Sequence, residues 1–431
     1  MKGAKADPVI ITGARVIDPA SGRDEVVDVH LKNGRIHELG ASLPRNGVNT
    51  IDASGLILAP GLVDVLVKTG EPGAEARETL RSAGKAAAAG GVTTLVVSPQ
   101  TDPVIDDPAM VDFIKRRGRK RAAVHILPAG GLTRGLNGEL LAEIGLMKEA
   151  GAVLFTNGDR PIGNAAIMRN ALTYAGGMDA LISNRPIEPD LSANGVMNAG
   201  DFASRLGLGG IPAIAERIMV ERDVALAEAS GTRLLIDQLS TGDALDVVRQ
   251  AKARGVRVCC SVSIHHLTLN ELDVGDYRTF ARLSPPLRKE EDRLAMIAGI
   301  SDGTIDAVVS GHDPRPAEEK RLPFSESSPG AVGLETLLSG ALSLVHNGEV
   351  SLKDMLYVLS ASPARLLGLG CGQLEAGTAA DLVLFDLDKP WVCDANKLRS
   401  KSKNTPYDGR RMQGRVAMTF VDGLCVFKRQ P

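Results

Sequence analysis

Hydrophobic and polar residues alternate in short runs near both ends of the chain. Residues 9–57 contain such runs between turn residues, and the pattern returns after about residue 370 in AADLVLFDL and RVAMTFVDGLCVFK. A period of two is typical of strands that bury one face. The pattern predicts antiparallel β units at both ends, and we expect them to form one small β-sandwich from residues 1–57 and 368–431.

Between these ends, short apolar runs alternate with segments of helical spacing that are rich in Ala, Leu, Glu, Lys and Arg. The eight runs are LVDVLVK, TTLVVS, AAVHILP, AVLFT, ALIS, RLLID, RVCCS and IDAVVS. Nearly continuous apolar strands are typical of a parallel sheet that is covered on both faces. Eight strand and helix repeats therefore predict an α/β fold, a (β/α)8 barrel over residues 58–367.

Length and charge narrow the class of protein. The chain has 431 residues, a formal net charge of -2 and no apolar stretch of the roughly 20 residues that a membrane span needs. A net charge this close to zero does not indicate binding to nucleic acid or to an anionic membrane. The N-terminal segment has no signal-peptide core, so we expect a cytoplasmic protein.

The first apolar run leads into a turn in the segment GLVDVLVKTGEPG, residues 61–73. Strand residues two apart share a face, so Leu66 and Lys68 are expected to point together into the barrel. Leucine has no lone pair and lysine is normally protonated, so neither residue suits a zinc site. The segment resembles the His-x-His and Arg-Glu-Pro-Gly stretch of bacterial dihydroorotases, in which the imidazoles bind metal and the arginine holds a substrate carboxylate. Gly70 stands at that arginine position.

The resemblance to dihydroorotases, members of the amidohydrolase superfamily, covers nearly the whole chain in order. The segments AAAAGGVTTLVV, MNAGDFASRLGLGGIPAIAE, SPPLRKEEDR, GAVGLETLL and SKSKNTPYDG match the family's framework. The resemblance implies the amidohydrolase barrel with its β-sandwich, and zinc as the family's cofactor.

At the remaining site positions the chain departs from the family. The bridging carboxylate of the fourth strand is replaced in FTNGDRP, where Asn157 fills the slot and Asp159 is displaced by one or two residues. The resemblance also puts Arg185 and Gln238 at histidine positions of the fifth and sixth strands, and Gly311 at the catalytic aspartate. Substrate-side asparagines are replaced by Gln100 and Ser284.

General-base attack by metal-bound water requires both the ion and a carboxylate within reach. With these positions replaced, we expect no bound zinc and a non-catalytic dihydroorotase homologue. The resemblance implies a structural or regulatory partner of aspartate transcarbamoylase in de novo pyrimidine biosynthesis, in a hetero-oligomer. A homodimer is also compatible with the sequence.

Two alternatives remain open. The chain could be an active cyclic-amide hydrolase, acting on dihydroorotate or a hydantoin through a rebuilt site with Asp159, His312 or Asp313 as its base. It could also be a sensor in which Lys68 and Arg185 bind an anionic metabolite. Structural ion pairing of these two cations with Asp159, Asp237 or Asp313 competes with that role, because buried charge requires a partner. His312 and Asp313 are adjacent, so we expect them on opposite faces rather than in a dyad.

Overall fold

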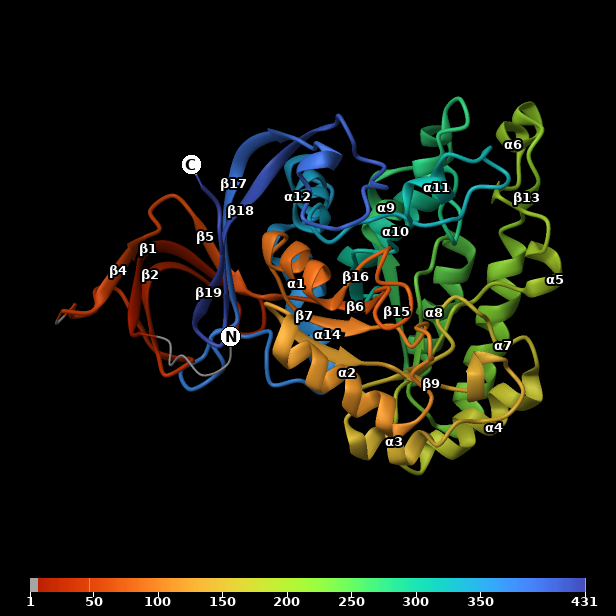
Figure 1. Cartoon of the computed structure of the whole chain (residues 1–431), viewed down its shortest axis with the longest axis horizontal. Coiled ribbons are helices and arrows are strands. Elements are labelled where there is room, and N and C mark those ends of the chain that lie inside the picture. The colour runs from red at the N-terminus through yellow and green to blue at the C-terminus, as the bar shows by residue number, and fades with distance from the viewer. Residues whose placement is uncertain (1–6, 46, 431) are drawn as a thin grey trace.

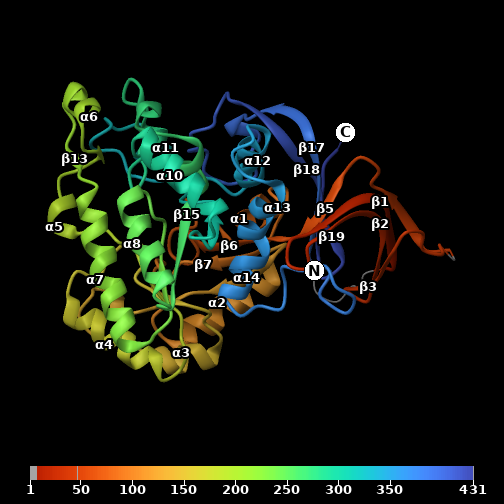
Figure 2. The same ribbon diagram turned by 180° about the vertical axis from the view of Figure 1, so that it is seen from behind.

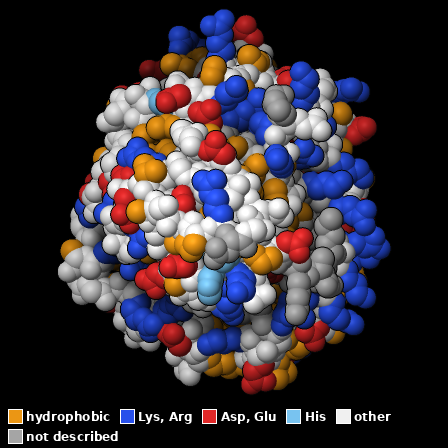
Figure 3. Space-filling model, turned by 90° about the vertical axis from the view of Figure 1, so that its left-hand side faces the viewer, with side chains coloured by type: hydrophobic (Ala, Val, Ile, Leu, Met, Phe, Trp, Pro, Cys, Tyr) orange, Lys and Arg blue, Asp and Glu red, His pale blue; other side chains and the backbone are white. Residues whose placement is uncertain are grey.

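The computed structural model describes residues 7–45 and 47–430. A sheet formed by both ends of the chain lies beside a barrel with helices around it (Figure 1). Figure 2 shows the same arrangement from behind, with the sheet and the barrel side by side. The end of the molecule formed by the sheet carries charged side chains of both signs (Figure 3).

The terminal sheet joins the two ends of the chain. Its strands follow the order β19-β18-β17-β5-β1-β2-β3, with β4 beside β1, and β5 pairs with β17 in antiparallel fashion. The strands are β1 (Val9–Asp18), β2 (Arg23–Lys32), β3 (Arg35–Gly40), β4 (Asn49–Asp52), β5 (Ile57–Pro60), β17 (Leu382–Val392), β18 (Arg411–Val421) and β19 (Leu424–Lys428). Residues from both ends, including Ile11, Val29, Leu384 and Phe420, share one buried core.

The barrel is built from parallel strands, and its first and last strands meet. The strands are β6 (Leu62–Val67), β7 (Val92–Val97), β8 (His125–Pro128), β9 (Gly130–Gly131), β10 (Phe155–Thr156), β11 (Ile182–Asn184), β14 (Leu234–Ile236), β15 (Val258–Ser263) and β16 (Ala307–Val309). Ala129 alone separates β8 from β9, which together act as one barrel strand. The backbone N–H of Ser310, after β16, donates to Asp64 in β6. The predicted eight-stranded barrel is confirmed.

Helices cover the outside of the barrel. The longer helices are α1 (Leu80–Ala89), α2 (Pro108–Arg121), α3 (Ile144–Ala150), α4 (Ala165–Gly176), α7 (Ile214–Ser230), α8 (Gly242–Ala253), α10 (Glu290–Ser301) and α12 (Leu337–His346). Helix α1 begins with a capping box between Thr79 and Ser82 and buries an alanine-rich face. Helix α2 begins after Asp107, which caps it, with Pro108 in the first turn.

Shorter elements follow the carboxyl ends of several barrel strands or lie between α12 and the terminal sheet. They are α5 (Pro189–Ser192), β12 (Met197–Asn198), α6 (Asp201–Leu206), β13 (Gly210–Ile211), α9 (Ile264–Thr268), α11 (Ala317–Lys320), α13 (Leu352–Leu356) and α14 (Ser362–Leu366). Active sites of such barrels lie at the carboxyl ends of the strands, which we call the mouth. Among the described residues, none of the helices combines the length and hydrophobicity required to cross a membrane.

Candidate functional site

A cavity of only about 20 Å³ lies at the carboxyl ends of the barrel strands. The replaced site residues line it: Leu66, Lys68, Arg185, Gln238 and Gly311. A space of this size holds about one water molecule. The structure thus brings these five residues together, and little free volume remains between them.

Two of the replaced positions that are not glycine have a left-handed backbone. Leu66 has φ 61° and Gln238 has φ 53°, a region that residues other than glycine adopt at a cost. Leu66 nevertheless lines the small cavity together with Lys68, as the alternation predicted. The backbone thus holds an unfavourable conformation at both positions although neither side chain can bind zinc.

The space of the lost side chains has been taken by other groups. A Cβ atom on Gly311 would lie 2.5 Å from the Ser263 hydroxyl oxygen, and one on Gly70 would lie 1.8 Å from the carbonyl oxygen of Ala74. Neither an aspartate at 311 nor an arginine at 70 fits this structure without movement of its neighbours. Gly70 does not line the small cavity. It lines a second, wider cavity at the mouth of the barrel.

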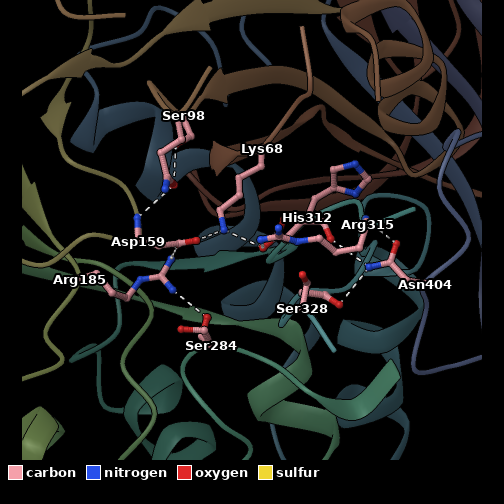
Figure 4. Close-up of polar contacts among 12 residues, drawn as sticks. Lys68, Ser98, Asp159, Arg185, Ser284, His312, Arg315, Ser328 and Asn404 are labelled. Atoms are coloured by element: carbon pink, nitrogen blue, oxygen red, sulfur yellow. Dashed lines mark hydrogen bonds and ion pairs between the residues drawn. The ribbon is translucent and has the colours of Figure 1, made fainter. Parts of the chain in front are cut away.

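Side-chain charges occupy the centre of the site instead of ligands (Figure 4). The Lys68 ammonium group donates to Asp159 and, at 2.7 Å, to Asp313. Arg185 Nη2 lies 2.8 Å from Asp237 and 3.3 Å from Asp159. Asp159 therefore bridges two fixed cations. Both cations that were considered for anion binding are already paired with carboxylates.

Burial makes these ion pairs strong determinants of protonation. The Arg185 side chain is 4% exposed and that of Asp237 is 1% exposed. Burial alone would lower the pKa of Arg185, but Asp237 and Asp159 outweigh it and raise the pKa. Burial alone would raise the pKa of Asp159, but Lys68 and Arg185 lower it to about 2. Asp159 is thus ionised and engaged at neutral pH.

Asn157 does not occupy the bridging position expected for it. Its amide oxygen accepts from the backbone N–H of Thr133, and its amide nitrogen donates to the Thr133 hydroxyl. The side chain is thereby held against the segment after β9, and Asp159 reaches the centre instead. Asn157 thus contacts neither cation, and the displaced carboxylate of Asp159, two residues further along, contacts both.

His312 and Asp313 do not form a dyad. His312 Nε2 lies 3.7 Å from a Glu78 carboxylate oxygen, in a fully buried pair, whereas Asp313 contacts Lys68 and Arg315. Glu78 also accepts from Ser400, so His312 belongs to the packing between α1 and the C-terminal segment.

Two histidines outside the family's site positions, His265 and His266, also line the small cavity. His265 and His266 belong to α9, directly after β15, and are buried. Burial lowers the pKa of His265 to about 3 and that of His266 to about 4, so both rings are neutral at pH 7. His266 Nε2 contacts the carbonyl oxygens of Pro285 and Pro286 and so ties α9 to the segment before α10. The signal in the sequence was the doublet in SIHHLTL.

A second, wider cavity of about 290 Å³ also lies at the mouth of the barrel. Its lining includes Lys68, Gln100, Arg160, Asp313 and Arg315. Gln100 accepts from the backbone N–H of Asp159 and so fixes the loop after β10. Ser284 acts through its backbone, whose carbonyl oxygen accepts from Arg185 at 2.8 Å.

The residues at the centre do not suit zinc, the cofactor that the sequence resemblance implies. Leu66 offers no donor atom, and Lys68 and Arg185 place two positive charges beside the position where a dication would lie. Elsewhere in the described part of the chain, one group could hold a metal: His125, Asp381 and Asp422, with ligand atoms within 4.8 Å of one another. His125 begins β8, so this group lies at the opposite end of the barrel from the mouth.

Comparisons with known proteins place these features in a family. A dihydro-orotase-like family model matches residues 55–244, and the amidohydrolase family model matches residues 194–426. A dihydroorotase of Pelobacter propionicus is 42% identical over 98% of this chain and 100% of its own length. The chain belongs to the dihydroorotase family. A dihydroorotase of Geobacter metallireducens gives the same identity and coverage.

Solved structures place the dihydroorotase-family chain within the amidohydrolase fold. The L-hydantoinase of Arthrobacter aurescens superposes with a TM-score of 0.88 at 26% identity, over 98% of this chain and 96% of the hydantoinase. The dihydropyrimidinase of Brevibacillus agri gives a TM-score of 0.86 at 20% identity, over 98% and 95%, and supports the fold alone.

Proposed function

We propose that this chain is a non-catalytic member of the dihydroorotase family that acts in de novo pyrimidine biosynthesis as a structural or regulatory partner of aspartate transcarbamoylase. The observation that carries the proposal is the ion-pair network at the barrel centre. There, Asp159 bridges Lys68 and Arg185 at the position where the family holds metal.

Metal-dependent hydrolysis of a cyclic amide needs an ion to acidify water and a free carboxylate to take its proton. The cavity at the centre, about 20 Å³, leaves little room for an ion with a substrate. Gly311 replaces the catalytic aspartate, and Ser263 fills the space of its side chain. Loss of function therefore involves packing as well as ligand identity.

The partner follows from the family resemblance and from what the chain keeps. The terminal sheet and the barrel are retained in full, whereas the mouth has lost its reactive groups. A protein kept for its surface needs this framework and not the centre. The resemblance names aspartate transcarbamoylase, the preceding enzyme of the pathway, as the protein that such a surface would bind.

A second candidate is an active cyclic amidohydrolase with a rebuilt site. The names of the relatives favour it, since they are dihydroorotases and a hydantoinase. The wider cavity at the mouth, about 290 Å³, has room for a small ring. Its base would be Asp159, Asp313 or His312. Asp159 and Asp313 pair with cations, and His312 is buried against Glu78, so each candidate base is already engaged with a charged neighbour. The sensor alternative requires an anion that displaces Asp159 from Lys68 or Asp237 from Arg185.

Co-expression with the aspartate transcarbamoylase of the same organism tests these functions. Mass, metal content, dihydroorotate turnover and transferase activity are measured for the complex and for each protein alone. The dihydroorotase of Geobacter metallireducens serves as the positive control for turnover. A complex of defined mass, without turnover, supports the scaffold role. Turnover by the chain alone would establish the rebuilt hydrolase, and a chain that stays alone or forms only a homodimer would refute the partnership.

A further inference from the structure

A groove of about 700 Å³ lies between helix α2, strand β8 and strand β19, on the opposite side of the barrel from the mouth. Most of its lining is apolar: Ala122, Ala123, Val124, Ile126, Leu127, Val421, Leu424 and Val426. A cavity of this size with an apolar lining is typical of a surface that another molecule covers. Neither of the two cavities at the mouth shares any of these residues.

One face of α2 forms a wall of the groove. Lys115, Gly118 and Arg119 recur at helical spacing along it, and Ala122 directly follows the helix. A Cβ atom on Gly118 would lie 2.6 Å from Ile126 Cβ, so the helix packs closely on β8 at this point. The wall is therefore a fixed part of the barrel rather than a loop.

The last turn of α2 carries unpaired positive charge beside the groove, whose charged lining includes Arg119 and Lys115 and one carboxylate, Asp422. Arg119, Lys120 and Arg121 are exposed and form no hydrogen bond or ion pair with any residue in the described part of the chain. Basic residues in a last turn stabilise the helix dipole, but the effect is confined to that turn. Three consecutive cations exceed this need in a chain whose net charge is -2. They attract an acidic partner.

The opposite wall is an open sheet edge. Strand β19 ends the strand order of the terminal sheet and pairs only with β18 among the described strands. Its residues Leu424, Cys425 and Val426 line the groove, and exposed Lys428 lies at its end. An outer edge offers backbone N–H and C=O groups to an added strand. An extended segment placed here gains backbone hydrogen bonds on one side and apolar contacts on the other.

We infer that this groove, the α2/β19 groove, is the docking site for an extended, acidic segment of aspartate transcarbamoylase that carries apolar side chains. The inference rests on the proposed function, because it assigns the surface by which the two proteins meet. Charge complementarity favours an acidic partner over a second copy of this chain. In a two-fold symmetric contact, a second copy would bring its own Arg119, Lys120 and Arg121 against the same three cations, which would repel it.

The test uses the full chain and the transcarbamoylase of the same organism. The charge-reversal variant R119E/K120E/R121E removes the positive charge beside the groove, and V426D places a carboxylate on the edge strand inside the groove. The matched control K289E/R321E/K389E reverses three exposed cations that also form no ion pair, away from the groove. Affinity is measured by titration at low and at physiological salt, with circular dichroism to establish that each variant is folded.

We expect each groove variant to weaken the complex about tenfold or more, the control to bind as the wild type, and salt to weaken the wild type more than the charge-reversal variant. A complex that forms equally well with both groove variants would overturn the inference and leave the proposed function standing. A wild type that forms no complex would overturn both. A homodimer that dissociates in the groove variants would also overturn the inference, because a second copy would be the occupant.

Discussion

The Lys68 ammonium group lies 2.7 Å from a carboxylate oxygen of Asp313 and also contacts Asp159. Lys68 follows the first barrel strand, Asp159 follows β10 and Asp313 follows the last barrel strand. The contact therefore connects the carboxyl ends of three barrel strands. A side-chain cation supplies the positive charge that holds the carboxylates together.

Restoring the two strand histidines should not restore hydrolysis. In L66H/K68H, the imidazoles would return, but Arg185 and Gln238 would still lie at the centre and Gly311 would still lack a carboxylate. Loss of Lys68 also leaves Asp159 and Asp313 with one cation fewer. We expect no dihydroorotate turnover above background, measured by absorbance, and no zinc at one ion per chain by mass spectrometry.

The variant L66H/K68H/R185H/Q238H/G311D tests whether packing also prevents activity at the site. Because a Cβ on Gly311 meets the Ser263 hydroxyl oxygen at 2.5 Å, we expect this variant also to need S263A before it gains activity. Turnover by L66H/K68H alone would contradict the account of the centre given above.

Removing the buried carboxylate Asp237 should destabilise the fold. D237N leaves Arg185 with its more distant contact to Asp159, 3.3 Å away, and with the carbonyl oxygen of Ser284. Loss of one partner of a buried pair costs about 3 kcal/mol, and the free energy of unfolding in urea measures this. Arg15 and Asp24 form an exposed pair, so D24N should cost less than about 1 kcal/mol.

The double variant R185M/D237N separates pairing from packing. If the cost of D237N comes from an unpaired guanidinium, adding R185M should recover part of it, so the two effects should not add. Additive losses would indicate that each side chain acts through packing alone.

Acid should weaken the protein through Asp159. Its pKa in the fold is about 2, below the ordinary value of 3.8, because Lys68 and Arg185 outweigh the effect of burial. A carboxyl group whose pKa is depressed by folding stabilises above its unfolded pKa, and this stability is lost as pH falls from about 4 to about 2. The contribution is about 2 kcal/mol at neutral pH. We expect D159N to lose it at pH 7 and to lack this part of the acid dependence, with D276N, at an exposed site, unchanged.

The fold was predictable from the sequence because its signals are local. The apolar runs and the alternation at both ends depend only on neighbours along the chain, and they gave the barrel and the terminal sheet. The replaced positions could be named because each stands in a segment that resembles a family motif, and all five line the same cavity: Leu66, Lys68, Arg185, Gln238 and Gly311.

The arrangement inside the site was not predictable, since it depends on contacts between distant segments. Asn157 turns toward Thr133 and leaves the centre to Asp159, which no spacing indicates. His265 and His266 reach the cavity only because α9 begins directly after β15. The closure of space beside Gly70 and Gly311 likewise requires the positions of Ala74 and Ser263.

Asp64 should make the fold less stable as pH rises, which is opposite to the effect expected of Asp159. Its side chain is fully buried between β6 and the end of β16. One oxygen accepts from Ser310 at 2.9 Å and the other has no partner among the described residues. Burial raises its pKa from 3.8 to about 6. A carboxyl group whose pKa is raised by folding favours the protonated form, so stability is full below about pH 4 and falls as pH rises through 6.

The expected loss between pH 4 and pH 7 is about 3 kcal/mol, because each pKa unit corresponds to about 1.4 kcal/mol. D64N cannot ionise, and its amide oxygen can still accept from Ser310, so its stability should lack this decline even if the absolute value changes. Urea unfolding at pH 4, 5, 6 and 7 for wild type, D64N and D276N measures the slopes. Equal slopes for the wild type and D64N would show that Asp64 stays ionised in the fold, with a partner that compensates its burial.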